Sequence, residues 1–270
     1  MRRYLCLEFK RAFCNINFIL AIAIAFGICI WHFIENVWKY RNYILDGTYP
    51  LSAFEKWIGA DMSSLQPLLY FLLIPILCAL PYARSFYFDV KSGFIIQLIT
   101  RENKEKYIAA KFIIAFLNGA VIAVIPLIGD FIMTNTVFPA IIPQSGTGFF
   151  SICDTRIWAE LFYTHPYVYL MLYGLMDAVF FGLFNTIAIW AVTFINNGFW
   201  ITLMPFLSYA FIYCMFTFVD MLQYAPVFFL QPNQTFKTAI EAELFELLIL
   251  VLLNVFFYLW YAKRERINYE

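Results

Sequence analysis

Long apolar stretches alternate with short polar ones along the chain, and this alternation predicts six membrane-spanning helices. Crossing roughly 30 Å of hydrocarbon takes about twenty mostly apolar residues in an α-helix. The stretches that meet this requirement lie at about 16–34, 66–83, 108–133, 166–194, 200–219 and 244–261. The connections between them are too short for a separate soluble domain. We therefore expect one all-α integral membrane domain over residues 1–270.

The overall composition supports a lipid-exposed protein. Hydrophobic residues make up 63% of the chain and charged residues 13%, whereas soluble domains are roughly half apolar and about a quarter charged. The net charge is zero. Because the chain has no excess of positive charge, we do not expect nucleic acid as a partner. The expected environment of the protein is membrane lipid.

The positions of Lys and Arg predict the orientation of the spans. If the N-terminus is cytoplasmic, the inner segments are 1–15, 84–111, 195–199 and 262–270, and they hold thirteen of the eighteen basic residues. Cytoplasmic loops carry such an excess. We therefore expect both termini in the cytoplasm and a multi-pass protein of a cell membrane, the bacterial plasma membrane in the first instance.

The loop after the second span holds a third of the basic residues in an amphipathic pattern. Its apolar residues Phe86, Val90, Phe94 and Leu98 recur at helical spacing, and polar residues occupy the other face. This period predicts a short amphipathic helix. A basic loop that fixes topology and rests on the anionic leaflet is one interpretation. A docking helix that passes force from a cytoplasmic partner into the spans is the other.

The same loop carries a spaced motif. After a proline-bearing span ending LPYARS, the chain reads DVKSGFIIQLITRENKEKYIAAK, which resembles the permease subunits of type-2 ABC transporters, the exporter class. The family pattern is an acidic residue, x-x-G, apolar residues, R, and then K/R-x-Y-x-x-x-K. Its matching positions here are Asp89, Gly93, Arg101, Lys106, Tyr107 and Lys111. Many members have Glu in place of Asp89.

The resemblance implies a transporter subunit driven by a separate ATPase. The chain has no G-x-x-x-x-G-K-[ST] phosphate loop, so ATP and Mg²⁺ would be bound by two ATP-binding subunits, and we expect no cofactor and no enzymatic activity on this chain. A second permease copy or homologue would complete the substrate path. By resemblance, loop 84–107 is the coupling element, braced by an amphipathic helix over 1–15. The docking and coupling candidates are Phe86, Asp89, Val90, Lys91, Gly93, Phe94, Leu98, Arg101, Lys106, Tyr107 and Lys111.

Two polar residues inside the predicted spans are candidates for the substrate path. Asp177 lies near the middle of the fourth span, where a carboxylate must face protein or water because its insertion into lipid is costly. It contacts a substrate or a proton in one interpretation, and it is a structural acid in the other. Asn185 is the second candidate, although an asparagine in a span commonly bonds a neighbouring helix.

The outer side offers weaker signals. Phe54, Trp57 and Ile58 share a helical face, which predicts a helix lying on the outer leaflet. Acids near the outer ends of spans are usually solvated, and four lie there: Glu35, Asp130, Asp220 and Glu246. His32 and His165 are far apart in sequence, so we expect no metal site.

Two other functional classes remain as alternatives. A secondary transporter driven by an ion gradient would favour inverted repeats and several buried acids. An intramembrane enzyme would need a nucleophile or paired acids with a histidine on facing spans, and the SGTG turn at 145–148 only superficially resembles one. For an exporter, the substrate class stays open between a peptide, a lipid-like molecule and a drug.

Overall fold

The computed structural model describes residues 2–44, 52–61, 64–95, 104–143, 157–233 and 240–263, and these parts are helices and their connections without a strand. Six helices are long and apolar enough to cross a membrane, which confirms the six predicted spans. They run over Ile16–Asn42, Gln66–Lys91, Lys104–Val137, Pro166–Ala191, Gly198–Phe218 and Glu243–Lys263. The chain is therefore built as a multi-pass membrane protein.

The first half of the chain contains the N-terminal helix and three spans. The elements are α1 (Arg2–Phe13), α2 (Ile16–His32) with a π-helical turn (Phe33–Val37) and a 3-10 turn (Trp38–Ile44), α3 (Ala53–Lys56), α4 (Gln66–Ala79), α5 (Ala83–Lys91) and α7 (Lys104–Val137). In the second half are α8 (Ala159–Thr164), α9 (Pro166–Ala191), α10 (Gly198–Phe218), a 3-10 turn (Leu222–Tyr224), α11 (Pro226–Phe229) and α12 (Ile240–Lys263).

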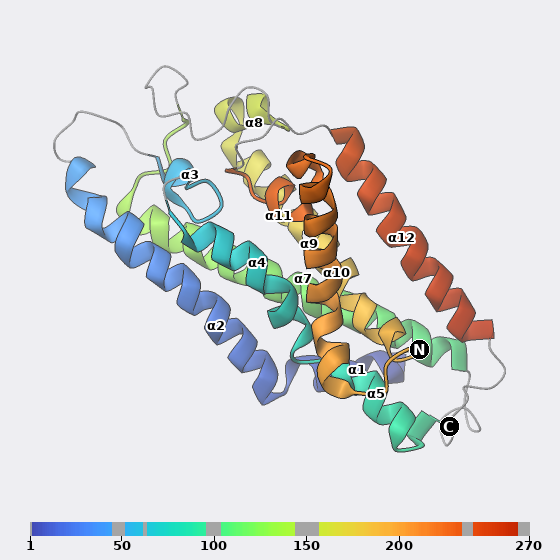
Figure 1. The fold of residues 1–270 in the computed structure, drawn as a ribbon. Helices are drawn as coiled ribbons and strands as arrows, with labels where there is room; N and C mark the ends of the chain where they lie inside the picture. Colours follow the sequence, from blue (N-terminus) through green and yellow to red (C-terminus); the bar gives the residue numbers. More distant parts are fainter. Residues whose placement is uncertain are drawn as a thin grey trace.

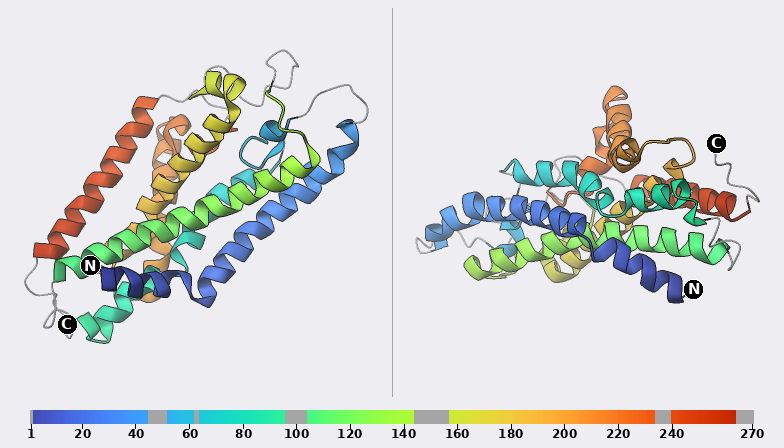
Figure 2. Two further views of the ribbon diagram at one scale, coloured as in Figure 1. Left: turned by 180° about the vertical axis from the view of Figure 1, so that it is seen from behind. Right: turned by 90° about the horizontal axis from the view of Figure 1, so that it is seen from below.

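Helix α7 is the centre of the bundle. It packs most extensively against α9 and also contacts α1, α2, α4 and α12. Figure 1 shows α2 and α12 at opposite margins, with α1 and α5 together at one end of the bundle. In Figure 2, α1 lies across this end, and α10 stands out from the layer of the other helices. We call this the α5 end of the bundle.

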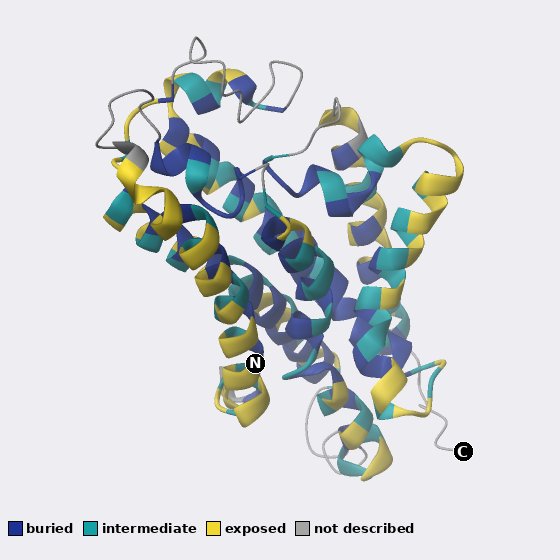
Figure 3. Cartoon of the chain, turned by 60° about the vertical axis from the view of Figure 1, so that its left-hand side comes forward, coloured by how far each residue is buried: buried dark blue, intermediate teal, exposed yellow. Residues whose placement is uncertain are grey.

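The outward faces of the spans are apolar. Met171 is 72% exposed, Ile16 66% and Phe211 64%, and exposed residues follow the outer faces of the helices in Figure 3. In water such faces would be an aggregation hazard. In a bilayer they contact acyl chains.

The predicted amphipathic helix of the loop is shorter than its period indicates. Helix α5 ends at Lys91, and Gly93 has φ of +70°. Glycine adopts this left-handed conformation without a Cβ penalty and so ends helices readily. The continuous helix expected from Phe86 to Ile99 is therefore wrong beyond Lys91, and its last turn falls outside the described residues.

The predicted helix on the outer leaflet is also wrong. Phe54, Trp57 and Ile58 are at most 4% exposed, because the segment 52–61 folds into the bundle rather than onto its surface. The ring of Phe54 packs against that of Phe131 at 5.3 Å between centroids. The Ala53 amide donates to the Pro139 carbonyl at 3.1 Å. The apolar face of this segment is thus buried by protein, not lipid.

Helices α7 and α9 approach closely at two glycines. A Cβ on Gly119 would lie 2.7 Å from the Phe181 carbonyl oxygen, and one on Gly182 would lie 2.7 Å from the Phe116 ring. At the same crossing the Asn185 side chain donates to the Ala115 carbonyl at 2.7 Å. Small residues and an interhelical hydrogen bond are the usual means of holding helices together in lipid.

Gly119→Ala is expected to destabilise the bundle by about 1–3 kcal/mol, the usual range for overpacking, because the backbone carbonyl it meets cannot rotate away. Gly174→Ala is the matched control, since its new Cβ would meet only Val124, at 3.9 Å. The free energy of unfolding in mixed micelles, titrated with SDS, measures both. Equal stability of the two variants would show that the α7–α9 crossing tolerates a methyl group.

Candidate functional site

A buried cluster of charged side chains joins α1, α5 and α7 at the α5 end. Its centre is Lys111, which is 0% exposed. The Lys111 Nζ atom lies 2.6 Å from Asp89 Oδ2 and 2.8 Å from Glu8 Oε2, and it donates to the Ser85 hydroxyl at 2.5 Å. One ammonium therefore uses its three donors on partners from two other helices.

Arg11 closes the cluster from the solvent side. Its Nη1 atom lies 3.0 Å from both carboxylate oxygens of Asp89 and 3.2 Å from Glu8 Oε1. Burial by itself lowers the pKa of Arg11, but the nearby carboxylates of Asp89 and Glu8 outweigh it, so that the pKa lies above its usual value. Two acids and two bases balance, and we call these four residues the ion-pair cluster.

Two tyrosines add hydrogen bonds to the same carboxylate oxygens that Lys111 contacts, Glu8 Oε2 and Asp89 Oδ2. The Tyr82 hydroxyl donates to Glu8 at 2.7 Å and the Tyr107 hydroxyl to Asp89 at 2.6 Å. Both rings also flank the ammonium, with Lys111 Nζ at 5.2 Å from the Tyr82 centroid and 5.5 Å from that of Tyr107. These are cation–π distances.

Helical spacing explains how each helix supplies its share. Glu8 and Arg11 are three residues apart on α1, and Tyr107 and Lys111 are four apart on α7, so that each pair lies on one face. Asp89 lies on the inward face of α5. A buried ion pair adds little net stability, because desolvation offsets attraction, but removing one partner is strongly unfavourable. The ion-pair cluster therefore fixes how α1 and α5 sit on α7.

The coupling candidates fall into two groups. Phe86, Asp89, Tyr107 and Lys111 are at most 5% exposed inside the chain itself. Lys91 and Lys106 are exposed, and Val90, Gly93 and Phe94 are intermediate. The Phe94 ring lies under the Arg11 guanidinium at 5.3 Å. Leu98 and Arg101 lie outside the described residues.

Sequence reasoning missed four members of this region: Glu8, Arg11, Tyr82 and Ser85. The spaced motif contained Asp89, Tyr107 and Lys111, but no spacing links α1 to α7. An acid in the otherwise basic N-terminal segment was the available signal for Glu8.

The substrate-path candidates are not part of the ion-pair cluster. Asn185 is 2% exposed at the α7–α9 crossing, where its amide is bonded to a backbone carbonyl. Asp177 is 1% exposed, and its Oδ1 atom has no hydrogen-bond partner among the described residues. The structure thus brings Asn185 into helix packing and leaves Asp177 buried elsewhere.

A second polar cluster lies at the opposite end of α7. His32 is 0% exposed between two acids, with Nδ1 at 3.2 Å from Asp130 and Nε2 at 3.3 Å from Asp61. Asp130 also accepts from the Ile58 amide at 2.7 Å. The expectation that Asp130 is solvated is therefore wrong, because segment 52–61 covers it. A neutral imidazole has one N–H and donates to one of the two carboxyls, and the two contacts place the ring between both acids.

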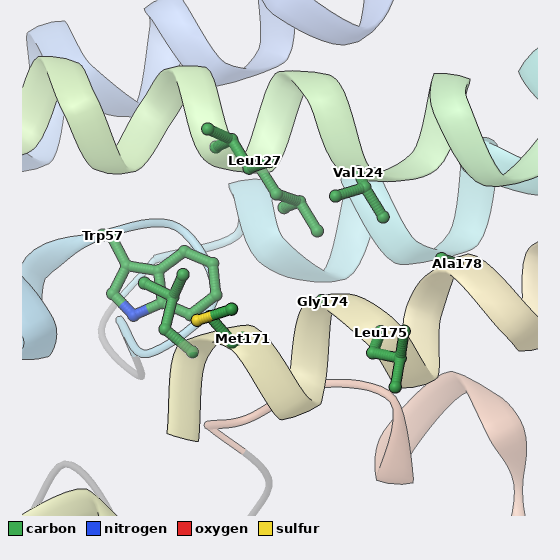
Figure 4. Close-up of a pocket in the computed structure, with 9 residues that line it drawn as sticks. Trp57, Val124, Leu127, Met171, Gly174, Leu175 and Ala178 are labelled. Carbon is green, nitrogen blue, oxygen red and sulfur yellow. The ribbon is translucent and has the colours of Figure 1, made fainter. Parts of the chain in front are cut away.

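An apolar pocket of about 290 Å³ lies between α7, α9 and Trp57. Figure 4 shows Val124 and Leu127 on one side and Gly174 and Leu175 on the other. The side chains that line it offer only apolar surface apart from the indole nitrogen. Because Leu175 is 63% exposed, the pocket lies at the outer surface of the helices.

Among the described residues, no group of three His, Cys, Asp or Glu side chains is arranged to hold a metal ion. Comparison of the chain with family models, with curated proteins and with solved structures gave no match.

Proposed function

We propose that this chain is the membrane-spanning permease subunit of an ATP-driven exporter of the type-2 ABC class, and that an ATP-binding subunit docks at α5. In this proposal the α5 end is cytoplasmic, and ATP and Mg²⁺ are bound by the partner. Two permeases and two ATP-binding subunits form the working unit, with the substrate path between the permeases.

The observation that carries the proposal is the two-sided character of α5. On its inner face, Phe86 and Asp89 are buried, and Asp89 belongs to the ion-pair cluster. On its outer face Phe88 is 56% exposed, and Arg84 and Lys91 are exposed beside it. A short helix fixed on one side and free on the other is suited to receive a partner's motion.

Helix α7 supplies a path along which that motion could travel. It carries Lys111 near one end and Asp130 near the other, and these nineteen positions span about 28 Å at 1.5 Å per residue. Both residues are 0% exposed and held by side chains from other elements. A displacement of α5 would therefore act on the whole length of the central helix.

This refines the roles of the predicted coupling residues. Asp89, Tyr107 and Lys111 would hold the docking helix in place, because their side chains are buried within the chain. Contact with the ATP-binding subunit would fall to exposed residues, above all Phe88 and Lys91. The basic and aromatic character of this face suits an acidic groove with an apolar floor.

Phe88→Asp is expected to reduce copurification of an ATP-binding subunit encoded in the same operon by tenfold or more, since losing a central interface aromatic removes about 2 kcal/mol or more. Copurification from co-expressing cells measures it. Met221→Asp, an exposed residue beyond the far end of α10, is the matched control and should copurify like the wild type. Full retention of the ATP-binding subunit by Phe88→Asp would refute docking at α5.

A further inference from the structure

Three buried or half-buried acids in the second half of the chain have oxygens without a partner. Asp177 on α9 is 1% exposed and Glu243 on α12 is 6% exposed. Among the described residues, no hydrogen bond reaches Asp177 Oδ1, Glu243 Oε1 or either carboxyl oxygen of Glu246. Buried polar groups are nearly always paired, so these oxygens are exceptions that call for an explanation.

The three acids lie in one neighbourhood. The carboxyls of Asp177 and Glu246 both interact electrostatically with Tyr209 of α10, and Glu243 interacts with Glu246. The Tyr209 side chain is 0% exposed, and its hydroxyl also has no hydrogen-bond partner in the described part of the chain. Helix α9 contacts both α10 and α12, so the group lies along α9 where these two helices pack against it. We call Asp177, Tyr209, Glu243 and Glu246 the acidic seam.

Among the described residues, α4, α9, α10, α11 and the adjoining end of α12 supply no basic side chain that compensates these acids. Helices α4, α9, α10 and α11 contain no Lys, Arg or His, and the basic residue of α12 is Lys263 at its other end. The hydroxyl group of Tyr70 donates its hydrogen bond to the Ala123 carbonyl at 2.6 Å, so it does not donate to the acids. An isolated carboxylate in such surroundings needs a proton or a counter-cation.

The surroundings favour an organic cation over a metal ion. The described acids do not converge in a group of three that could hold a metal. Aromatic rings do line the seam: Phe184 and Phe181 lie 5.3 and 6.0 Å from the Tyr209 ring between centroids. Carboxylates combined with aromatic faces recognise ammonium and guanidinium groups.

We propose that the acidic seam binds the cationic group of the transported substrate, an organic ammonium, phosphonium or guanidinium ion with an apolar body. Asp177 is the principal anion, Glu246 and Glu243 extend the site along α12, and Tyr209 offers its ring and hydroxyl. Because α12 lies at the margin of the bundle (Figures 1 and 2), the seam is one helix away from lipid. The inference rests on the proposed function, since it names the substrate class of that permease.

Binding of tetraphenylphosphonium to the purified chain in lipid nanodiscs tests the inference. The wild type is expected to bind this apolar cation, and Asp177→Asn or Glu246→Gln to bind it at least tenfold more weakly. Asp220→Asn, the same substitution at an exposed residue beyond α10, should bind like the wild type. The neutral triphenylphosphine oxide should not distinguish the wild type from Asp177→Asn.

Absence of binding by the wild type would overturn the proposal. Wild-type affinity in both Asp177→Asn and Glu246→Gln would overturn it as well. Size-exclusion profiles establish that each variant is folded. Because two variants are used, the test can still be carried out if one of them does not fold. The measurement needs no ATP-binding subunit. A failed docking experiment with intact cation binding would therefore refute the coupling role alone, and intact docking without cation binding would refute the acidic seam alone.

Discussion

Lys111→Met is expected to destabilise the protein by about 3–5 kcal/mol, the range for removing one partner of a buried ion pair. The substitution keeps an unbranched side chain of similar length but leaves Glu8 and Asp89 buried with only Arg11 as a counter-charge. The free energy of unfolding by SDS in mixed micelles measures the effect. Hydrogen exchange in α1 and α5 should increase at the same time, because both helices lose their common attachment to α7.

Two controls isolate the electrostatic origin of this effect. Lys91→Met is the same substitution at an exposed lysine of α5 and should leave stability nearly unchanged. Combining Lys111→Met with Glu8→Gln restores a neutral cluster, so that most of the loss should be recovered. If the double variant were as unstable as Lys111→Met alone, packing rather than charge balance would hold α5 to α7.

The Lys111 result also bears on the proposed mechanism. If α5 transmits motion to α7 through the ion-pair cluster, Lys111→Met should retain the ATP-binding subunit while weakening the coupling of ATP hydrolysis to transport. Phe88→Asp should instead lose the subunit itself. The two variants thus separate the attachment of the docking helix from its contact with the partner.

His32→Leu has the second large expected effect, a loss of about 3 kcal/mol or more. Without the imidazole, the carboxylates of Asp130 and Asp61 lose the ring that lies between them. The Ile58 amide bond to Asp130 cannot compensate for two facing acids. Unfolding in mixed micelles again measures stability, and hydrogen exchange over 52–61 should rise, because this segment is anchored at the same point.

The second histidine provides the matched control. His165→Leu makes the same change at an exposed position between α8 and α9, and it should alter stability by no more than a few tenths of a kcal/mol. Adding Asp130→Asn to His32→Leu removes one of the facing charges and should restore part of the loss. Equal stability of His32→Leu and His165→Leu would show that the two acids are compensated in another way.

The sequence by itself determined the membrane class and the number of spans, and it placed the start of each span within four residues and the end within eight. A helix needs about twenty apolar residues to cross lipid, and this requirement is local, so that each stretch can be identified without knowledge of the others. Asp89, Tyr107 and Lys111 could also be selected, because they match the spaced motif of the family that the chain resembles. Their partners could not.

Only the tertiary structure decided which polar groups meet. Glu8 and Lys111 are separated by about a hundred residues, and so are His32 and Asp130, and no helical or strand period extends over such a distance. The burial of the segment containing Trp57 also depended on residues distant in sequence, because its apolar face could be covered by lipid or by α7. The end of α5 depended on one backbone angle at Gly93, which an apolar period does not encode. Contacts between distant segments arise from packing of the whole bundle, and for this reason they appear only in three dimensions.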